Sequence, residues 1–140
     1  MRIFLDANVL VSVLNKEYPL YSYSSRILSL AGKKSFELFT SPVCLAIAFY
    51  FAEKKSGTER ALNKIRLLVS KISIADTDRK AVMMAAQNKA VKDIEDGLEY
   101  YSAVNAGCEC IISEDTGDFY FSQIEVIHSL QFLEKYLLEK

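Results

Sequence analysis

Short apolar runs alternate with stretches that carry apolar residues at helical spacing along the whole chain. The apolar runs predict five β-strands, at residues 2–6, 36–40, 71–75, 108–113 and 124–127. The intervening stretches predict helices at residues 7–14, 24–32, 42–55, 58–70, 79–88 and 94–106, and a last helix from Ser129 in which Leu130, Leu133 and Leu137 face inward. Because parallel strands need crossover connections, this alternation predicts an α/β fold, with a central parallel sheet of four to five strands between two layers of helices.

Capping and turn-forming residues predict where several of these helices begin and end. Ser41 is expected to cap the third helix, and either Asp76 or Asp78 the fifth. Gly32 is a suitable residue to end the second helix. The stretch 18–23, which contains three tyrosines and a proline, interrupts the helical pattern and is expected to separate the first helix from the second.

The length and composition are typical of one globular domain that spans residues 1–140. Apolar residues make up 51% of the chain and charged residues 25%, which excludes a disordered or collagen-like chain. No run approaches the roughly 18–20 apolar residues that a membrane span requires. An acid follows Met1 within the first six residues, unlike in a signal peptide. We therefore expect a cytoplasmic protein without a membrane segment.

Three cysteines and one histidine offer little for a disulfide framework or a classical zinc site. Cys44, Cys108 and Cys110 cannot all pair, and only His128 could supply a nitrogen ligand. We expect the three thiols to be buried as small hydrophobic groups.

The net charge of −1 conceals a strongly polarised chain. Residues 1–53 carry five bases and four acids, residues 54–92 ten bases and three acids, and residues 93–140 two bases and eleven acids. The middle segment is typical of a face that binds a polyanion, although a lysine-rich stretch is often only a solvated helix face. The candidate contacts to an RNA backbone are Lys54, Lys55, Lys89 and Lys92. Lys89 and Lys92 are expected to lie one helical turn apart.

Acidic residues stand at the ends of predicted strands. Asp6 ends the first strand, Asp115 and Asp118 follow the fourth, and Asp96 lies in the first turn of the helix before the fourth. Acids at helix starts and in turns also have ordinary structural roles. An unpaired carboxylate directly after a buried strand would nevertheless be costly, and ligands of open parallel sheets bind beyond the carboxyl ends of the strands. Carboxylates that converge there would need a cation, and Mg²⁺ or Mn²⁺ suits oxygen ligands.

This set of residues predicts metal-assisted hydrolysis of phosphodiester bonds. The chain offers no activated serine or cysteine, and its one histidine lies far along the sequence. In such a reaction the metal lowers the pKa of a bound water and neutralises charge on the phosphate. A carboxylate orients the water or accepts its proton. The basic middle segment would then hold the nucleic-acid backbone beside the acids.

Three motifs resemble those of the PIN domain, of the kind found in VapC-type ribonuclease toxins of bacterial toxin–antitoxin pairs. FLDANVLVSVL resembles the family's strand followed by Asp-x-Asn. DGLEYYSAVNAGCECIIS resembles its helix that begins with an aspartate, and SEDTGDF its acidic segment after the fourth strand. The resemblance covers essentially the whole chain. It implies catalytic roles for Asp6, Asp96 and Asp115, metal binding by these three and Asp118, and supporting roles for Asn8 and Ser113.

One position departs from the family pattern. The family usually places a glutamate on the helix after the second strand, and this chain has Ile47 there. Glu53 lies six residues later, about 120° short of two full turns, and is too distant to substitute easily. Glu99, one turn after Asp96, is the better candidate for a compensating carboxylate in a supporting role.

The resemblance implies a Mg²⁺- or Mn²⁺-dependent endoribonuclease toxin that is held inactive by a small antitoxin protein, and it also implies a homodimer. An alternative follows from Ile47, namely a PIN-like module that has lost catalysis and binds RNA or a protein. A third class, phosphoryl transfer on an aspartate, is disfavoured. Phosphatases of the haloacid dehalogenase type need a second aspartate where Asn8 stands, and receiver domains need an acceptor aspartate in mid-chain.

Overall fold

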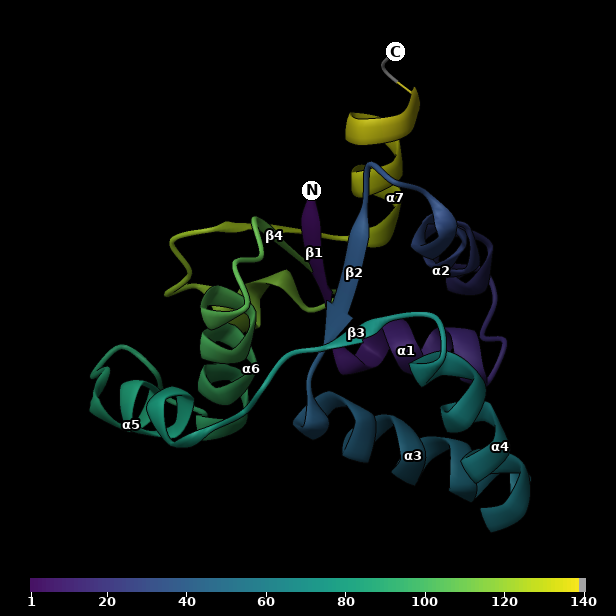
Figure 1. Cartoon of the computed structure of the whole chain (residues 1–140), viewed down its shortest axis with the longest axis horizontal. Helices are drawn as coiled ribbons and strands as arrows, with labels where there is room; N and C mark the ends of the chain where they lie inside the picture. The colour runs from purple at the N-terminus through teal and green to yellow at the C-terminus, as the bar shows by residue number, and fades with distance from the viewer. Residues whose placement is uncertain (139–140) are drawn as a thin grey trace.

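A five-stranded parallel sheet forms the centre of the computed structural model, which describes residues 1–138 (Figure 1). Along the sheet the strands stand in the order β3-β2-β1-β4-β5, and each neighbouring pair is parallel. The strands are β1 (Arg2–Leu5), β2 (Glu37–Thr40), β3 (Ser73–Ile74), β4 (Cys110–Ile112) and β5 (Glu125–Ile127). All five lie within the predicted runs, so the predicted sheet is confirmed.

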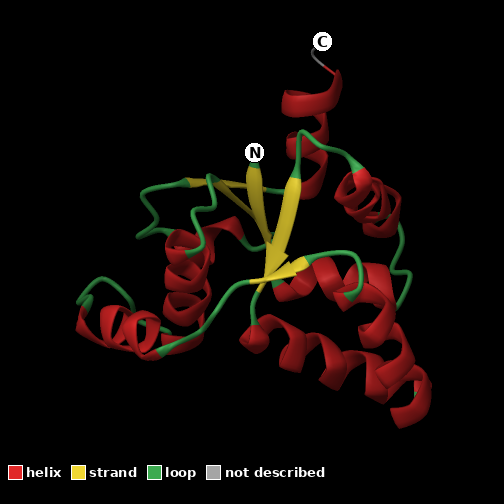
Figure 2. Ribbon diagram, in the orientation of Figure 1, coloured by secondary structure: helices red, strands yellow, loops and turns green. Residues whose placement is uncertain are grey.

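α-Helices connect the first four strands in turn and cover both faces of the sheet (Figures 1 and 2), whereas a 3₁₀ turn, Thr116–Phe119, connects β4 to β5. The α-helices are α1 (Ala7–Leu14), α2 (Leu20–Leu28), α3 (Pro42–Ser56), α4 (Thr58–Val69), α5 (Arg79–Gln87), α6 (Ile94–Asn105) and α7 (Ser129–Leu133). Helix α6 lies on one side of the strands with α5 packed against it, whereas α1 and α2 lie on the other side (Figure 1). This arrangement confirms the predicted α/β fold of three layers.

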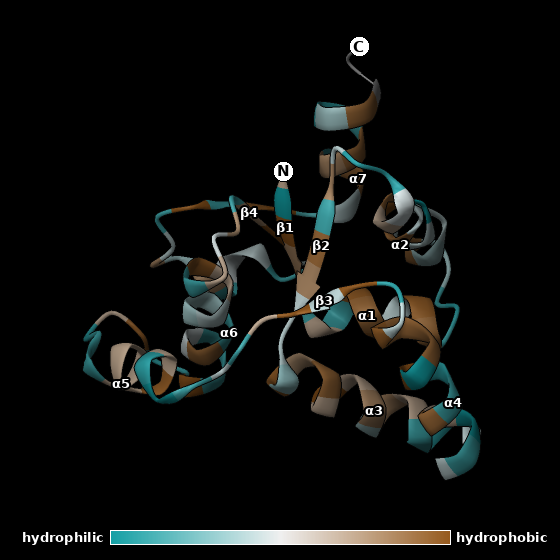
Figure 3. Cartoon of the chain, in the orientation of Figure 1, coloured by the Kyte–Doolittle hydropathy of each residue, from teal (hydrophilic) through white to brown (hydrophobic). Residues whose placement is uncertain are grey.

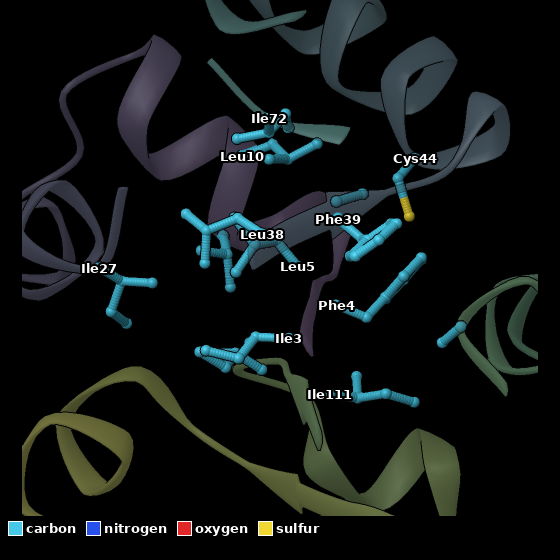
Figure 4. Close-up of a cluster of buried hydrophobic side chains, with 14 of the residues drawn as sticks. Ile3, Phe4, Leu5, Leu10, Ile27, Leu38, Phe39, Cys44, Ile72 and Ile111 are labelled. Atoms are coloured by element: carbon cyan, nitrogen blue, oxygen red, sulfur yellow. The ribbon is translucent and has the colours of Figure 1, made fainter. Parts of the chain in front are cut away.

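Strand β1 lies at the centre of the sheet and of the hydrophobic core. Phe4 pairs in register with Phe39 of β2 and with Ile111 of β4. Side chains of this central layer pack together in Figure 4. Both β1 and β2 begin with an exposed charged residue and continue with buried apolar ones (Figure 3). A continuous apolar run is typical of a strand covered by helices on both faces. Because β1 is the central strand, its carboxyl end at Leu5 and the following Asp6 are also buried.

The structure confirms the predicted N-cap of α3 and decides which of two aspartates caps α5. Ser41 Oγ accepts a hydrogen bond from Cys44 N at 3.2 Å at the start of α3. Asp78, not Asp76, caps α5, because its Oδ1 accepts from Ala81 N at 3.0 Å.

Helix α2 differs from the prediction at its start. It begins at Leu20, with Pro19 as its N-cap, so the stretch 18–23 contains the first turn of the helix instead of separating two helices. Proline interrupts a helix interior but is well tolerated at a helix start, where its missing N–H is not needed. The tail of the predicted helix forms a separate 3₁₀ turn, Ser29–Gly32.

The terminal helix turns two of the three predicted leucines inward. Leu133 is fully buried and Leu137 is partly buried, but Leu130 is 36% exposed, so its predicted inward position is wrong. Phe132 is buried instead and lies about 160° around the helix from Leu130, which turns Leu130 outward. The helical segment also changes to a π-helical turn at Glu134–Leu138.

All three cysteines are free and buried, as predicted. Within residues 1–138, no helix is long and apolar enough to cross a membrane.

Candidate functional site

A cavity of about 420 Å³ lies beyond the carboxyl ends of β1 and β4, lined by residues of α1, α3 and α6. Acidic side chains from four separate segments of the chain line it. They include all four predicted metal ligands and three further glutamates: Asp6, Glu17, Glu95, Asp96, Glu99, Asp115 and Asp118. Among the described residues that line this cavity there is no lysine, arginine or histidine.

Asp6 is held rigidly at the edge of the sheet. It follows β1 directly and serves as the N-cap of α1, with its Oδ1 accepting a hydrogen bond from Ala7 N at 2.6 Å. Its Oδ2 accepts a hydrogen bond of 2.7 Å from Ser113 Oγ, which follows the neighbouring strand β4. Only 7% of Asp6 is exposed. The same carboxylate therefore starts a helix and faces the cavity.

Asn8 and Ser113 connect Asp6 to the acids after β4. The Asn8 Nδ2 lies 3.2 Å from Ser113 Oγ and 3.3 Å from Asp115 Oδ2. Asn8 Oδ1 accepts a hydrogen bond from Glu114 N at 3.2 Å. Ser113 Oγ also accepts from Asp115 N at 3.0 Å. Asn8 and Ser113, two of the three residues predicted to support the site, thus contact both Asp6 and Asp115.

Helix α6 brings a second group of carboxyl groups to the cavity. Asp93 caps the helix by accepting from Glu95 N at 3.0 Å, and Asp96 follows in the first turn. Burial raises the pKa of Asp96 to about 7, and the negative charges of Asp93, Asp118, Asp6 and Glu95 add to this effect. Burial also raises the pKa of Glu95, again with nearby acids contributing. The acids are crowded enough to oppose one another's ionisation.

Glu99 lies one helical turn beyond Asp96, deep beside Asp6. It is 2% exposed, and its Oε2 has no hydrogen-bond partner. Burial, followed by a hydrogen bond to Asp6 and the neighbouring charges, raises the pKa of Glu99 to about 11. A buried carboxyl oxygen without a partner is unusual in a folded protein.

These carboxyl groups fit a divalent cation. They are hard oxygen donors, they converge from separate elements, and the described lining holds no base to neutralise them. Burial is the main cause of the raised pKa values of Asp96 and Glu99, and the neighbouring acids add to it. The Glu99 Oε2 also has no hydrogen-bond partner in the protein.

The position expected to carry a further acid is occupied by an aliphatic side chain. Ile47 lines the cavity from α3. Glu53, two turns along, instead accepts a hydrogen bond from Thr58 Oγ1 at 2.9 Å. Of the two glutamates considered as substitutes, Glu99 is the one that the structure brings into the cavity.

Three residues near the site were missed by the sequence reasoning. Glu95 is not part of the motif that contains Asp96, yet it lines the cavity beside Asp96. Glu17 follows α1 and reaches the same cavity through a turn that no periodicity predicts. Cys44, expected only to pack, lies with its Sγ 4.0 Å from Asp6 Oδ1.

The four candidate RNA-contacting lysines fall into two exposed pairs. Lys89 and Lys92 lie in the loop 88–93 and not on a helix, because α5 ends at Gln87 and Asn88 Oδ1 accepts a hydrogen bond from Ala90 N in a turn. Their predicted spacing of one helical turn is therefore wrong, although the loop leads directly into the start of α6.

Lys54 and Lys55 lie in the last turn of α3. The Lys54 ammonium stands 5.4 Å from the ring centre of Tyr50, and Lys55 Nζ donates a hydrogen bond to Asn15 O. Phe51, one turn earlier, lines the acidic cavity, so the pair lies close to its rim.

Comparison with known proteins identifies the family. A model of the PIN domain family matches residues 2–117. The chain belongs to the PIN domain family. A curated relative, "Ribonuclease VapC1" from Aquifex aeolicus (strain VF5), is 29% identical over 139 residues, which cover 96% of this chain and 95% of the relative.

Solved structures share the fold of this PIN domain. VapBC2 from Rickettsia felis, solved bound to a DNA fragment from its promoter, matches with a TM-score of 0.68 at 19% identity, covering 91% of this chain and 98% of the other. Mycobacterium tuberculosis VapC20, described as a toxin that cleaves the sarcin-ricin loop, matches with a TM-score of 0.67 at 15% identity, covering 87% and 95%.

Proposed function

We propose that this PIN domain is a divalent-metal-dependent endoribonuclease of the VapC type, the toxin of a toxin–antitoxin pair. The proposal extends to Mg²⁺ or Mn²⁺ as cofactor, to RNA as substrate and to a small antitoxin as inhibitor. It also includes a homodimer in the cytoplasm, where RNA is accessible. A curated relative that spans almost the whole chain carries the name of a ribonuclease, and structures of similar fold are described as VapBC complexes.

One observation carries the proposal. Carboxyl groups that are far apart in sequence, at Asp6, Asp96 and Asp115, line one cavity at the carboxyl edge of a parallel sheet. Ordinary capping accounts for the conformation of Asp6 but not for the convergence of three segments. Such convergence is the arrangement that a shared cation requires.

Asp6, Asp96, Asp115 and Asp118 would hold the cation, with Glu99 below them. When bound, the cation supplies a nucleophilic water at neutral pH and neutralises charge on the scissile phosphate. Asp6 would keep one geometry throughout, because Ala7 N and Ser113 Oγ fix its two oxygens. Asn8 would hold Asp115 at a fixed position relative to Asp6. The chain's own contribution is thus a preorganised set of oxygens.

RNA would approach from the side of the loop 88–93, which carries Lys89 and Lys92 and leads into α6, with Lys54 and Lys55 as a second contact. These ammonium groups would offset the repulsion between the phosphates and the acids. The alternative of a binding module without catalysis rests on Ile47 alone. It gains no support from the comparisons, and Glu99 leaves the cavity well supplied with carboxyl groups.

The test is cleavage of RNA by the purified protein with and without Mg²⁺ or Mn²⁺. We expect cleavage that requires the cation and that falls by at least about 100-fold in Asp6→Asn and in Asp96→Asn, since each removes a charge from the site. Asp76→Asn is the matched control, because Asp76 is exposed and lies outside the cavity. Equal cleavage by all four proteins, with their folds intact by circular dichroism, would exclude this site.

A further inference from the structure

Two carboxyl oxygens and a thiol sulfur lie close together at the deep end of the acidic cavity. One oxygen of Asp6, one oxygen of Glu99 and the Cys44 Sγ all lie within 4.8 Å of one another. The three residues are buried, with exposed fractions of 7%, 2% and 0%. The two acids line the cavity, and Cys44 lies behind them in the first turn of α3.

The fold fixes the position of the thiol. The Ser41 cap holds the first turn of α3 against the end of β2, with Cys44 N bonded to Ser41 Oγ. From there the Cys44 sulfur points toward the side chains of Phe39 and Phe4 (Figure 4). It reaches to 4.0 Å from Asp6 Oδ1. The position of Cys44 in the first turn of α3 therefore places its thiol next to the cavity.

Glu99 supplies an independent indication that a ligand belongs here. Its Oε2 is fully buried and has no hydrogen-bond partner. Leaving a buried polar atom unpaired is unfavourable, and native structures hold few such atoms. A carboxyl oxygen in this condition, beside a second carboxylate and a thiol, is suited to coordinate a positive ion.

We propose that Asp6, Glu99 and Cys44 form a site for a thiophilic divalent cation of the Zn²⁺ class, which binds here in place of Mg²⁺. Sulfur is a soft ligand that selects ions such as Zn²⁺, whereas Mg²⁺ prefers oxygen alone. Tetrahedral zinc with one sulfur and two oxygen ligands places the donor atoms about 3.3–3.6 Å apart. Side-chain shifts of about 1 Å would close the observed spacing to that geometry.

Binding would exchange a proton for the metal. The S–H bond of Cys44 breaks, the sulfur keeps the electron pair and bonds the cation, and the proton leaves through the cavity to solvent. The fourth position would stay open toward the cavity for water. Because Asp6 and Glu99 also belong to the proposed Mg²⁺ site, the two kinds of ion would exclude each other. The proposal shares these ligands with the proposed function but does not require RNA cleavage.

The experiment titrates metal-free, reduced protein with Cd²⁺, a thiophilic probe whose bond to a thiolate gives an ultraviolet charge-transfer band. We expect one Cd²⁺ per chain with this band, displaced by Zn²⁺. Cys44→Ser should abolish the band and raise the Kd for Cd²⁺ at least about 10-fold. Cys108→Ser is the matched control, since Cys108 is also buried but is not part of this group of donor atoms, and it should bind Cd²⁺ like the wild type.

Two results would overturn the proposal: no charge-transfer band in the wild type at saturating Cd²⁺, or a band that survives in Cys44→Ser. If Cys44→Ser fails to fold by circular dichroism, Glu99→Gln decides, because it keeps the thiol and removes one charged ligand. A rise in the Kd for Cd²⁺ of about 10-fold in that variant supports the site, and an unchanged Kd refutes it. A Cd²⁺ band without any RNA cleavage would refute only the proposed function, and Mg²⁺-dependent cleavage without a band only this inference.

Discussion

At the scale of single residues, the site is built from groups that are unfavourable without a cation. Glu99 is the extreme case, because it is buried beside Asp6 with one oxygen unpaired. The Asp6 carboxylate is better satisfied than that of Glu99, because Ala7 N and Ser113 Oγ each donate a hydrogen bond to one of its oxygens. The free energy of cation binding would therefore depend strongly on Glu99.

Glu99→Gln tests this dependence through stability alone. We expect the metal-free variant to be as stable as the metal-free wild type to within about 0.5 kcal/mol, because the Glu99 carboxyl group, whose pKa burial raises to about 11, is protonated at neutral pH and an amide can donate to Asp6 in its place. Saturating Mg²⁺ should raise the melting temperature of the wild type more than that of the variant, since an ion that binds only the folded state stabilises it. The measurement is thermal unfolding by circular dichroism with and without Mg²⁺.

Glu95→Gln serves as the control for that comparison. Glu95 also lines the cavity but is exposed, so its replacement should change both melting temperatures less. If Mg²⁺ stabilises Glu99→Gln as much as the wild type, Glu99 has no part in cation binding.

At the scale of elements, a small polar cluster attaches the helical turn Glu134–Leu138 to the sheet. Glu125 of β5 accepts hydrogen bonds from Lys135 Nζ and from Tyr136 OH, both on the π-helical turn after α7. Burial alone would raise the pKa of Glu125, but these two donors outweigh it, and the pKa is lowered from its usual 4.5. A Glu whose pKa is lowered on folding stabilises the fold only while it is ionised.

The sign of the pH dependence follows from this lowered pKa. The contribution of Glu125 is fully present above pH 4.5, its unfolded value, and is lost as the pH falls through the lower folded value. Glu125→Gln should thus cost about 0.5 kcal/mol at pH 7, since Glu125 is only partly buried and its partner Lys135 is exposed, and nothing once the carboxyl group is protonated. Urea unfolding at pH 7 and pH 3 measures both differences, and an equal cost at the two pH values would contradict the argument.

At the scale of the whole molecule, the parts that could be predicted from the sequence are those fixed by topology. Asp6 and Asp115 follow strands that become neighbours, so their meeting required only the correct strand order. Cys44 and Glu17 reach the site through helix packing and a turn, which no motif encodes. Leu130 was misplaced for a similar reason, because packing buries Phe132 on the nearly opposite side of the helix and so turns Leu130 outward.

The polarised charge of the chain also acts at this scale, and reversal of two charges tests it. Lys89→Glu with Lys92→Glu should weaken RNA binding about 10-fold and reduce the slope of log K against log salt by about 1–2, as fewer counterions are released. Lys33→Glu with Lys34→Glu is matched in charge but lies before β2, at the opposite end of the strand from the site. Binding is measured by fluorescence anisotropy in the Asp96→Asn background, which prevents cleavage. Equal weakening by both pairs would mean that net charge, and not the loop 88–93, attracts the RNA.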